Sequence, residues 1–147
     1  MNRRIAIASD HGGVELKAFL KQQTYAQPIE WIDLGTDSKE SVDYPDYGFK
    51  LAEYVASQQA ELGIAICGSG IGISIACNRH EDIRAAVCTN STMARLTRID
   101  NNANILCLGA RIVGEILAKD IVDAFLDTPF EQGGRHERRV NKLKRTT

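Results

Sequence analysis

A chain of 147 residues, 44% hydrophobic and 25% charged, is long enough for one domain with a substantial core. Its net charge of −1 excludes a general attraction to nucleic acid or to a membrane surface. No apolar run approaches a membrane span, and residues 1–4 lead straight into a strand, so we expect no signal peptide. The four cysteines form no C-x-x-C pair, which is typical of reduced thiols and predicts a cytoplasmic protein.

Short apolar runs alternate with helical patterns along the whole chain, with no repeat or linker, so we expect a single domain over residues 1–147. The predicted strands are 4–9, 29–34, 62–67, 83–88 and 104–108. The predicted helices are 14–23, 47–59, a short segment from residue 71, 91–100 and 114–126. Residues 35–47 form a polar loop able to cover a pocket. A glycine pair and a basic, helical tail end the chain within residues 130–147.

Strands that alternate with helices require right-handed parallel crossovers, which predicts an α/β three-layer sandwich. Five strands favour a doubly wound, Rossmann-like or flavodoxin-like parallel sheet in the order 2-1-3-4-5, with ligands where strands 1 and 3 diverge. Asp10 and His11 follow the first strand, and Cys67 ends the third. We therefore expect these two groups to meet at the carboxyl edge of the sheet.

The central stretch of the chain, residues 62–78, is an apolar strand, three alternate glycines and a small apolar helix. Such a turn leaves backbone N–H groups unpaired at a helix start, which favours an anion. Cys67 stands at its lip, where those groups would favour a thiolate able to act as a base or nucleophile. The alternative is a small buried residue beside a tight turn, an interpretation that suits Cys77, Cys88 and Cys107.

Other chemistries fit the glycine turn poorly. Gly68 to Gly72 do not form G-x-G-x-x-G, and no Lys-Ser/Thr pair of a nucleotide P-loop follows. A cysteine phosphatase loop would need Arg where Ile73 stands, and a receiver domain would need Asp in place of Cys67. A thiol beside an oxyanion hole remains, which is what an isomerase that forms an enediolate requires.

Several separated motifs resemble the type B ribose-5-phosphate isomerases of the ribose/galactose isomerase family. They are SDHGG at 9–13, DYP at 43–45, ICGSGIGIS at 66–74, NNAN at 101–104, LGAR at 108–111 and GGRH at 133–136. The resemblance implies interconversion of aldose and ketose phosphates without metal or cofactor, by a homodimer or homotetramer with shared active sites. It implies ribose 5-phosphate and ribulose 5-phosphate as substrates, in the pentose phosphate pathway.

The resemblance also assigns roles to residues. Cys67 resembles the base that moves a proton between C2 and C1, and Ser69 a relay for it. The backbone of Gly68, Gly70, Ile71 and Gly72 resembles the cradle of the enediolate. Substrate-binding positions match Asp10, His11, Asn101 and, for the phosphate, Arg111, Arg135 and Arg139. Tyr44 lines the pocket or belongs to the core.

One position departs from the family, which usually has His where this chain has Asp100. We expect Asp100 or His11 to open the sugar ring instead, although a carboxylate is a poor general acid unless burial raises its pKa. Asp100 and Asn101 lie between a helix and the fifth strand, at the amino edge of the sheet. We therefore predict that they serve a neighbouring subunit's site, and that the tail from about residue 130 packs on that subunit.

Two other functions stay open. A hexose-6-phosphate isomerase of the same family, of allose or galactose type, would carry the same motifs. A non-catalytic module that binds a sugar phosphate or a mononucleotide would use the same glycine turn. From spacing alone, Arg135 and Arg139 are equally a phosphate grip and part of a solvated basic tail.

Overall fold

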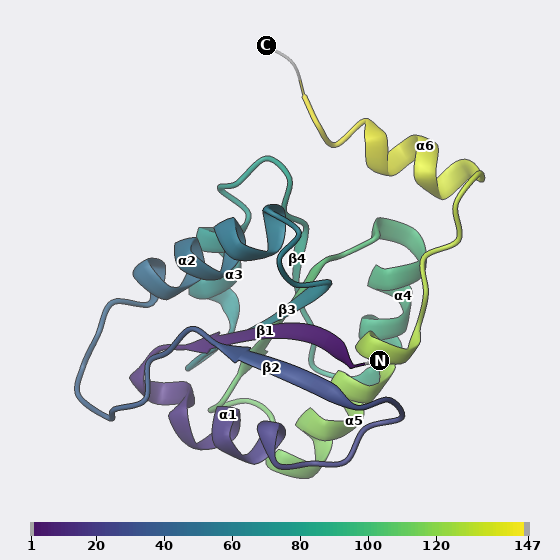
Figure 1. Ribbon diagram of the computed structural model, residues 1–147. Helices are drawn as coiled ribbons and strands as arrows, with labels where there is room; N and C mark the ends of the chain where they lie inside the picture. The colour runs from purple at the N-terminus through teal and green to yellow at the C-terminus, as the bar shows by residue number, and fades with distance from the viewer. Residues whose placement is uncertain (1, 146–147) are drawn as a thin grey trace.

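The computed structural model describes residues 2–145 as one parallel five-stranded sheet with helices on both faces (Figure 1). The strands are β1 Arg3–Ser9, β2 Ile29–Asp33, β3 Leu62–Cys67, β4 Ala85–Val87 and β5 Ile105–Gly109. The helices are the 3-10 turn η1 His11–Gly13, α1 Val14–Lys21, α2 Tyr44–Ala56, α3 Ile71–Cys77, α4 Ser91–Asn101, α5 Glu115–Asp127 and α6 Arg135–Asn141. The predicted α/β class is confirmed. Within residues 2–145, no helix is long and apolar enough to cross a membrane.

The strand order is β2-β1-β3-β5-β4, so the predicted order 2-1-3-4-5 is wrong for its last two members. β5 is buried along its whole length, as expected of a strand with neighbours on both sides. β4 has three residues, all half-buried, as expected of an edge strand. The exchange places the carboxyl end of β5 directly beside that of β3, with Gly109 paired to Cys67.

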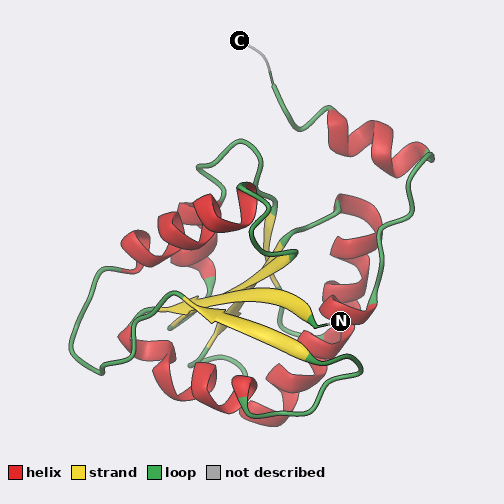
Figure 2. Ribbon diagram, in the orientation of Figure 1, coloured by secondary structure: helices red, strands yellow, loops and turns green. Residues whose placement is uncertain are grey.

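The exchange also changes the layer in which α4 lies. Because the chain turns back from β4 to β5, a right-handed crossover places α4 on the face opposite α3. α4 packs on α5, and α5 also contacts α1, whereas α2 and α3 pack together on the other face (Figure 2). Chains leaving β1 and β5 therefore turn to one face and the chain leaving β3 turns to the other, which opens the carboxyl edge around β3.

The two faces of the sheet bury side chains of different size. On β1, Ile5 and Ile7 point to the face of α1, α4 and α5, where Phe125 is fully buried. Ala6 and Ala8 point to the opposite face, where small residues let α2 come close. A Cβ on Gly63 would lie 2.9 Å from a Val55 methyl. Steric fit on this face therefore sets how closely α2 packs on the sheet. The helix begins at Tyr44 rather than at the predicted residue 47.

An ion-pair network stands at the carboxyl end of β2. The side chain of Lys17 is only 2% exposed, and its Nζ lies 2.6 Å from Asp33 and 2.8 Å from Asp37. Lys21 also pairs with Asp33, at 2.8 Å. Burial raises the pKa of Asp33, but hydrogen bonds from Lys17, Lys21 and Gly35 N–H outweigh it, and the pKa lies below its ordinary value.

We expect this network to make the chain less stable in acid. Because the pKa of Asp33 is lowered in the folded chain, its contribution to the free energy of unfolding is present above about pH 4. That contribution is lost as the pH falls through the folded-state value. Asp33→Asn should lower the free energy of unfolding by about 2 kcal/mol near neutral pH. On acidification, the free energy of unfolding of Asp33→Asn should fall by less than that of the unmodified chain.

Urea unfolding at neutral pH and at about pH 3 measures both quantities. Glu53→Gln, which changes an exposed carboxylate on α2, is the control and should follow the unmodified chain. An Asp33→Asn protein that loses as much stability in acid as the unmodified chain would contradict this assignment.

Candidate active site

The turn between β3 and α3 holds a sulfur against a backbone amide. Cys67 is the last residue of β3 and is 5% exposed, and its Sγ accepts a hydrogen bond from the N–H of Gly70 at 3.2 Å. The Oγ of the exposed Ser69 accepts one from the N–H of Ile71 at 3.1 Å. The side chain of Cys67 therefore faces the glycine turn, where an N–H donor stabilises developing negative charge.

Only glycine fits at the centre of this turn. Gly70 has a φ of 79°, and a Cβ there would lie 2.9 Å from the carbonyl carbon of Leu108. From the other side, a Cβ on Gly109 would lie 2.5 Å from the carbonyl oxygen of Ser69. The turn therefore presses backbone to backbone against the end of β5, which fixes the direction of the Gly70 N–H.

The end of β1 lies beside this turn, as predicted. Ser9 pairs with Ile66, and the N–H of Asp10 donates to the carbonyl of Ile66 at 3.1 Å. Asp10 is 8% exposed, and its carboxylate accepts a hydrogen bond from the N–H of Gly12 at 2.9 Å, which caps η1. A Cβ on Gly12 would lie 3.8 Å from the nitrogen of Gly68. The two loops are therefore in contact.

His11 belongs to the same edge and is half-buried. Its Nδ1 accepts a hydrogen bond from the N–H of Val42 at 3.1 Å. Val42 lies in the segment between β2 and α2, which the sequence predicts as a loop covering a pocket. His11 is thus the candidate catalytic imidazole on the same edge of the sheet as Cys67.

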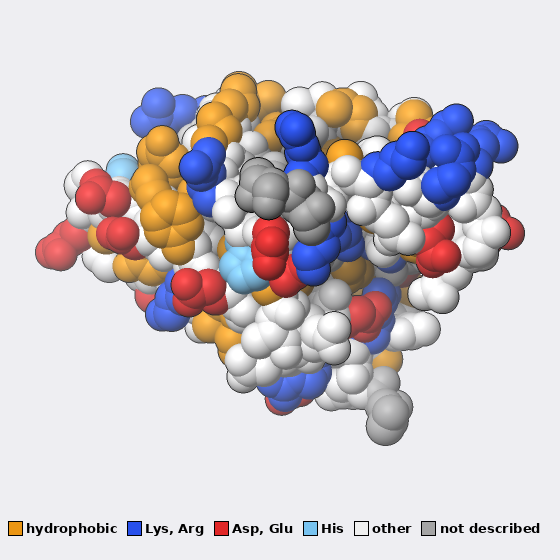
Figure 3. All heavy atoms as spheres, turned by 90° about the horizontal axis from the view of Figure 1, so that it is seen from above, with side chains coloured by type: hydrophobic (Ala, Val, Ile, Leu, Met, Phe, Trp, Pro, Cys, Tyr) orange, Lys and Arg blue, Asp and Glu red, His pale blue; other side chains and the backbone are white. Residues whose placement is uncertain are grey.

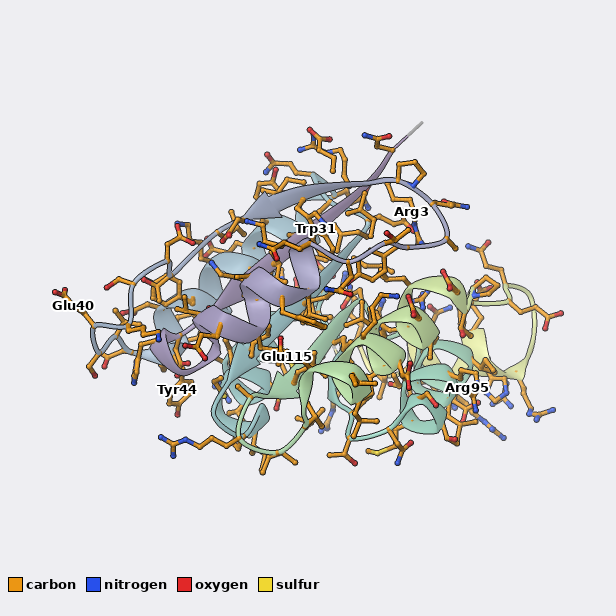
Figure 4. All side chains as sticks on the ribbon, turned by 90° about the horizontal axis from the view of Figure 1, so that it is seen from below. Arg3, Trp31, Glu40, Tyr44, Arg95 and Glu115 are labelled. Atoms are coloured by element: carbon orange, nitrogen blue, oxygen red, sulfur yellow. The ribbon has the colours of Figure 1, made fainter. Side chains whose placement is uncertain are left out.

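Arg111 and Tyr44 complete this edge. The N–H of Arg111 donates to the carbonyl of Gly68 at 2.9 Å, and a Cβ on Gly68 would lie 3.6 Å from the Arg111 side chain. A Cβ on Gly72 would lie 2.8 Å from the ring of Tyr44, which is 42% exposed. Tyr44 therefore stands at the rim rather than in the core, at the end of the molecule opposite Arg95 (Figure 4).

Four predicted site residues lie away from the carboxyl edge of the sheet. The register pairs Gly63 with Ile105 and Cys67 with Gly109, so the start of β5 is about 13 Å from Cys67. Asp100 and Asn101 precede that start at the end of α4. Exposed Arg135 and Arg139 lie on α6, which packs on α4. Figure 1 shows α6 far from the loop that leaves β2, and Figure 3 shows lysines and arginines gathered on the α6 side of the molecule.

Asp100 has a neighbour that its sequence position does not reveal. Its Oδ1 lies 3.6 Å from the Nε2 of His136, the second residue of α6. Both residues line a hollow of about 200 Å³ together with Asn101 and Arg139. Helical spacing separates His136 from Arg135 and Arg139, and only the GGRH motif marks it. The amino edge thus carries its own cluster of polar groups.

The buried thiols Cys88 and Cys107 differ from Cys67 in their surroundings. Burial raises the pKa of Cys88 to about 11. A hydrogen bond with Cys77, together with complete burial, raises the pKa of Cys107. These two thiols therefore stay protonated and inert. Among residues 2–145, no three side chains of His, Cys, Asp or Glu gather in a way that would hold a metal ion.

Comparison with known proteins places the chain among the sugar isomerases. A model of the ribose/galactose isomerase family matches residues 5–143, and the chain belongs to that family. The family resemblance expected from the sequence is confirmed.

Individual relatives agree over nearly the whole chain. Ribose-5-phosphate isomerase B of Escherichia coli K12 is 45% identical over 141 residues, which cover 96% of this chain and 94% of that protein. The crystal structure of a ribose 5-phosphate isomerase from Thermotoga maritima is 53% identical with a TM-score of 0.92, covering 98% of this chain and 99% of that one. The Mycoplasma genitalium ribose-5-phosphate isomerase B, solved with bound ribulose 5-phosphate, is 38% identical with a TM-score of 0.86, covering 97% and 95%.

Proposed function

We propose that this chain is an isomerase that interconverts ribose 5-phosphate and ribulose 5-phosphate through a cis-enediolate, with Cys67 as the base. Three relatives that match the chain over nearly their full length are named ribose-5-phosphate isomerases, and one of them was solved with ribulose 5-phosphate bound. The single observation that carries the mechanism is the hydrogen bond from Gly70 N–H to Cys67 Sγ. The four cysteines are free thiols, which supports the reducing cytoplasm as its location.

In the open-chain aldose, the Cys67 thiolate removes the proton from C2, and the electron pair of that bond moves to give the enediolate. Charge develops on the oxygen of C1, where backbone N–H donors of the turn stabilise it. Ser69 is exposed on the same turn, and it relays a proton between the oxygens of C1 and C2. The thiol then returns its proton to C1, which gives the ketose and regenerates the thiolate. No electron or atom enters from outside.

The proposed site is completed by a second copy of the chain. Within one chain, Asp100 and Arg139 are at the edge opposite Cys67. Two copies related by a two-fold axis, with their α4 helices antiparallel, would bring the amino edge of each to the carboxyl edge of the other. Met93, Leu96 and Ile99 are at least 40% exposed and lie along α4. Ile112 and Ile116 add 60% and 81% exposed side chains near the start of α5, which supports an apolar interface there.

Across that interface, the guanidinium groups of Arg135 and Arg139 would hold the phosphate together with Arg111. Asn101 would bind sugar hydroxyls. Ring opening falls either to His11, on the Cys67 edge, or to the partner subunit's Asp100. The contact between Asp100 and His136 orients the Asp100 carboxylate.

The base is tested by replacing Cys67 with Ala. Because the thiolate takes the carbon-bound proton, kcat should fall by about a thousandfold while the Kd for ribulose 5-phosphate stays within a fewfold. A coupled assay and calorimetry measure these two constants. Cys88→Ala, which changes an inert buried thiol, is the control and should keep its kcat. A Cys67→Ala protein that keeps the kcat of the unmodified chain would exclude this sulfur as the base, and a module that only binds would show no turnover in either form.

The shared site is tested by mixing two inactive proteins. In the proposed site, Cys67 comes from one chain and the two arginines of α6 come from its partner. Cys67→Ala and the double variant Arg135→Ala, Arg139→Ala therefore remove different halves of the site. In a random mixture of dimers, about half are mixed and each of these keeps one intact site, so activity should return to about a quarter of normal. Unfolding the two proteins together and refolding them, followed by the coupled assay, measures this recovery. A mixture that stays inactive while each variant remains dimeric would show that Cys67 and the two arginines act within one chain.

Ring opening is tested by comparing substrates. Asp100→Asn and His11→Asn should both be assayed with ribose 5-phosphate and with a four-carbon aldose phosphate, which cannot close into a furanose. The residue that opens the ring should lose about a hundredfold in kcat on the five-carbon substrate and much less on the four-carbon one. Equal losses on both substrates would assign that residue to binding.

A panel of pentose and hexose phosphates in the same assay decides between a pentose and an allose- or galactose-type enzyme.

A further inference from the structure

The segment between β2 and α2, residues 34–43, is a strap that runs along the carboxyl edge beside η1 and α1 (Figure 1). Its first residues extend the pairing of β1 with β2. Ser9 N–H donates to the Gly35 carbonyl at 2.6 Å, and Thr36 N–H donates to the Ser9 carbonyl at 2.7 Å. Beyond Thr36 the strap leaves the sheet, and Glu40 marks its outermost part (Figure 4). Side chains of η1 and α1 hold that outer part.

Two lysines tie the strap to α1, and they differ sharply in burial. Lys39 pairs with Glu15 at the surface, where both side chains are more than 70% exposed. Such a pair contributes little to stability. Lys17 is 2% exposed and bridges Asp33, at the end of β2, to Asp37, within the strap. A buried ammonium is costly unless carboxylates neutralise it, so the Lys17 bridge ties the strap to the sheet.

The far end of the strap contacts His11. Because Val42 N–H donates to His11 Nδ1, that nitrogen carries no proton. In the neutral ring the proton is then on Nε2, and the hydrogen bond at Nδ1 selects this tautomer. The strap therefore decides which nitrogen of His11 donates.

We propose that Lys17 is a positioning residue for the isomerisation, which acts through the strap to keep His11 as an Nε2–H donor. This inference rests on the proposed function, because it assigns His11 to the sugar-phosphate site. Lys17 itself touches no substrate. Its ammonium holds Asp37, the strap keeps its path, and Val42 stays in register with His11. The group that Nε2–H meets is an oxygen of the sugar phosphate.

Lys17→Met tests the proposal, with Lys39→Met as its matched control. Methionine fills a similar volume without a charge, Asp33 keeps Lys21 and Gly35 N–H, and Asp37 is 82% exposed and can turn to water. We expect kcat/KM to fall about tenfold in Lys17→Met, because small misplacements of a donor have large kinetic effects, and to stay within twofold in Lys39→Met. In a His11→Asn background, Lys17→Met should cost less than twofold. An equal loss with and without His11, or no loss, would overturn the proposal.

A spectroscopic readout decides the same point without catalysis. The nitrogen-15 shifts of the His11 ring at alkaline pH should show the Nε2–H tautomer in the unmodified chain and in Lys39→Met, and a mixture of tautomers in Lys17→Met. An unchanged tautomer in Lys17→Met would overturn the role of the strap, whatever the substrate is. Should Lys17→Met fail to fold, Asp37→Asn cuts the same anchor from the exposed side and is held to the same outcomes. If the chain proved inactive on every sugar phosphate, the proposed function would fail together with the role of Lys17 in the isomerisation, and the tautomer measurement would still decide whether the strap sets the proton of His11.

Discussion

The contact on which the site depends is the backbone approach of the glycine turn to the end of β5. Ser69 and Gly109 meet with no room for a Cβ, and the left-handed Gly70 turns its N–H back to Cys67. Close packing of this kind is rigid, because no side chain lies between the two backbones to adjust. The donor is therefore in place before the charge develops, which is the condition under which such a donor lowers a barrier.

The sequence predicted this turn well because all its determinants are local. An apolar strand, three alternate glycines and a cysteine at the strand end specify the turn within one short stretch. The contact between the loop after β1 and the glycine turn also followed from topology, since β1 and β3 are neighbours in the flavodoxin-like order. Predicting that β1 pairs with β3 needed only the order of the strands and no knowledge of side-chain contacts.

The order of the last two strands could not be obtained in the same way. Both candidate strands are short and apolar, and their order depends on which one has neighbours on both sides. The four apolar residues of Ile105–Leu108 fit the interior, whereas Ala85–Val87 fit an edge, but that difference is small at the level of sequence. The consequence for the site is large, because only the observed order brings Arg111 to Gly68. The contacts of Lys17 and His136 were likewise missed, because each joins segments distant in the chain.

The two edges of the sheet divide the proposed chemistry in an informative way. The carboxyl edge holds the sulfur, the turn, Asp10 and His11, to which the proposal assigns the proton transfer on the open-chain sugar. The amino edge holds Asp100, Asn101 and the arginines of α6, which the proposal assigns to binding the sugar and its phosphate and, as the alternative to His11, to ring opening. In the proposal neither set is complete by itself, and one chain keeps them a strand length apart. Dimerisation would therefore supply half of the site as well as stability, and a substitution on α4 that weakens the interface would reduce catalysis before it unfolds the chain.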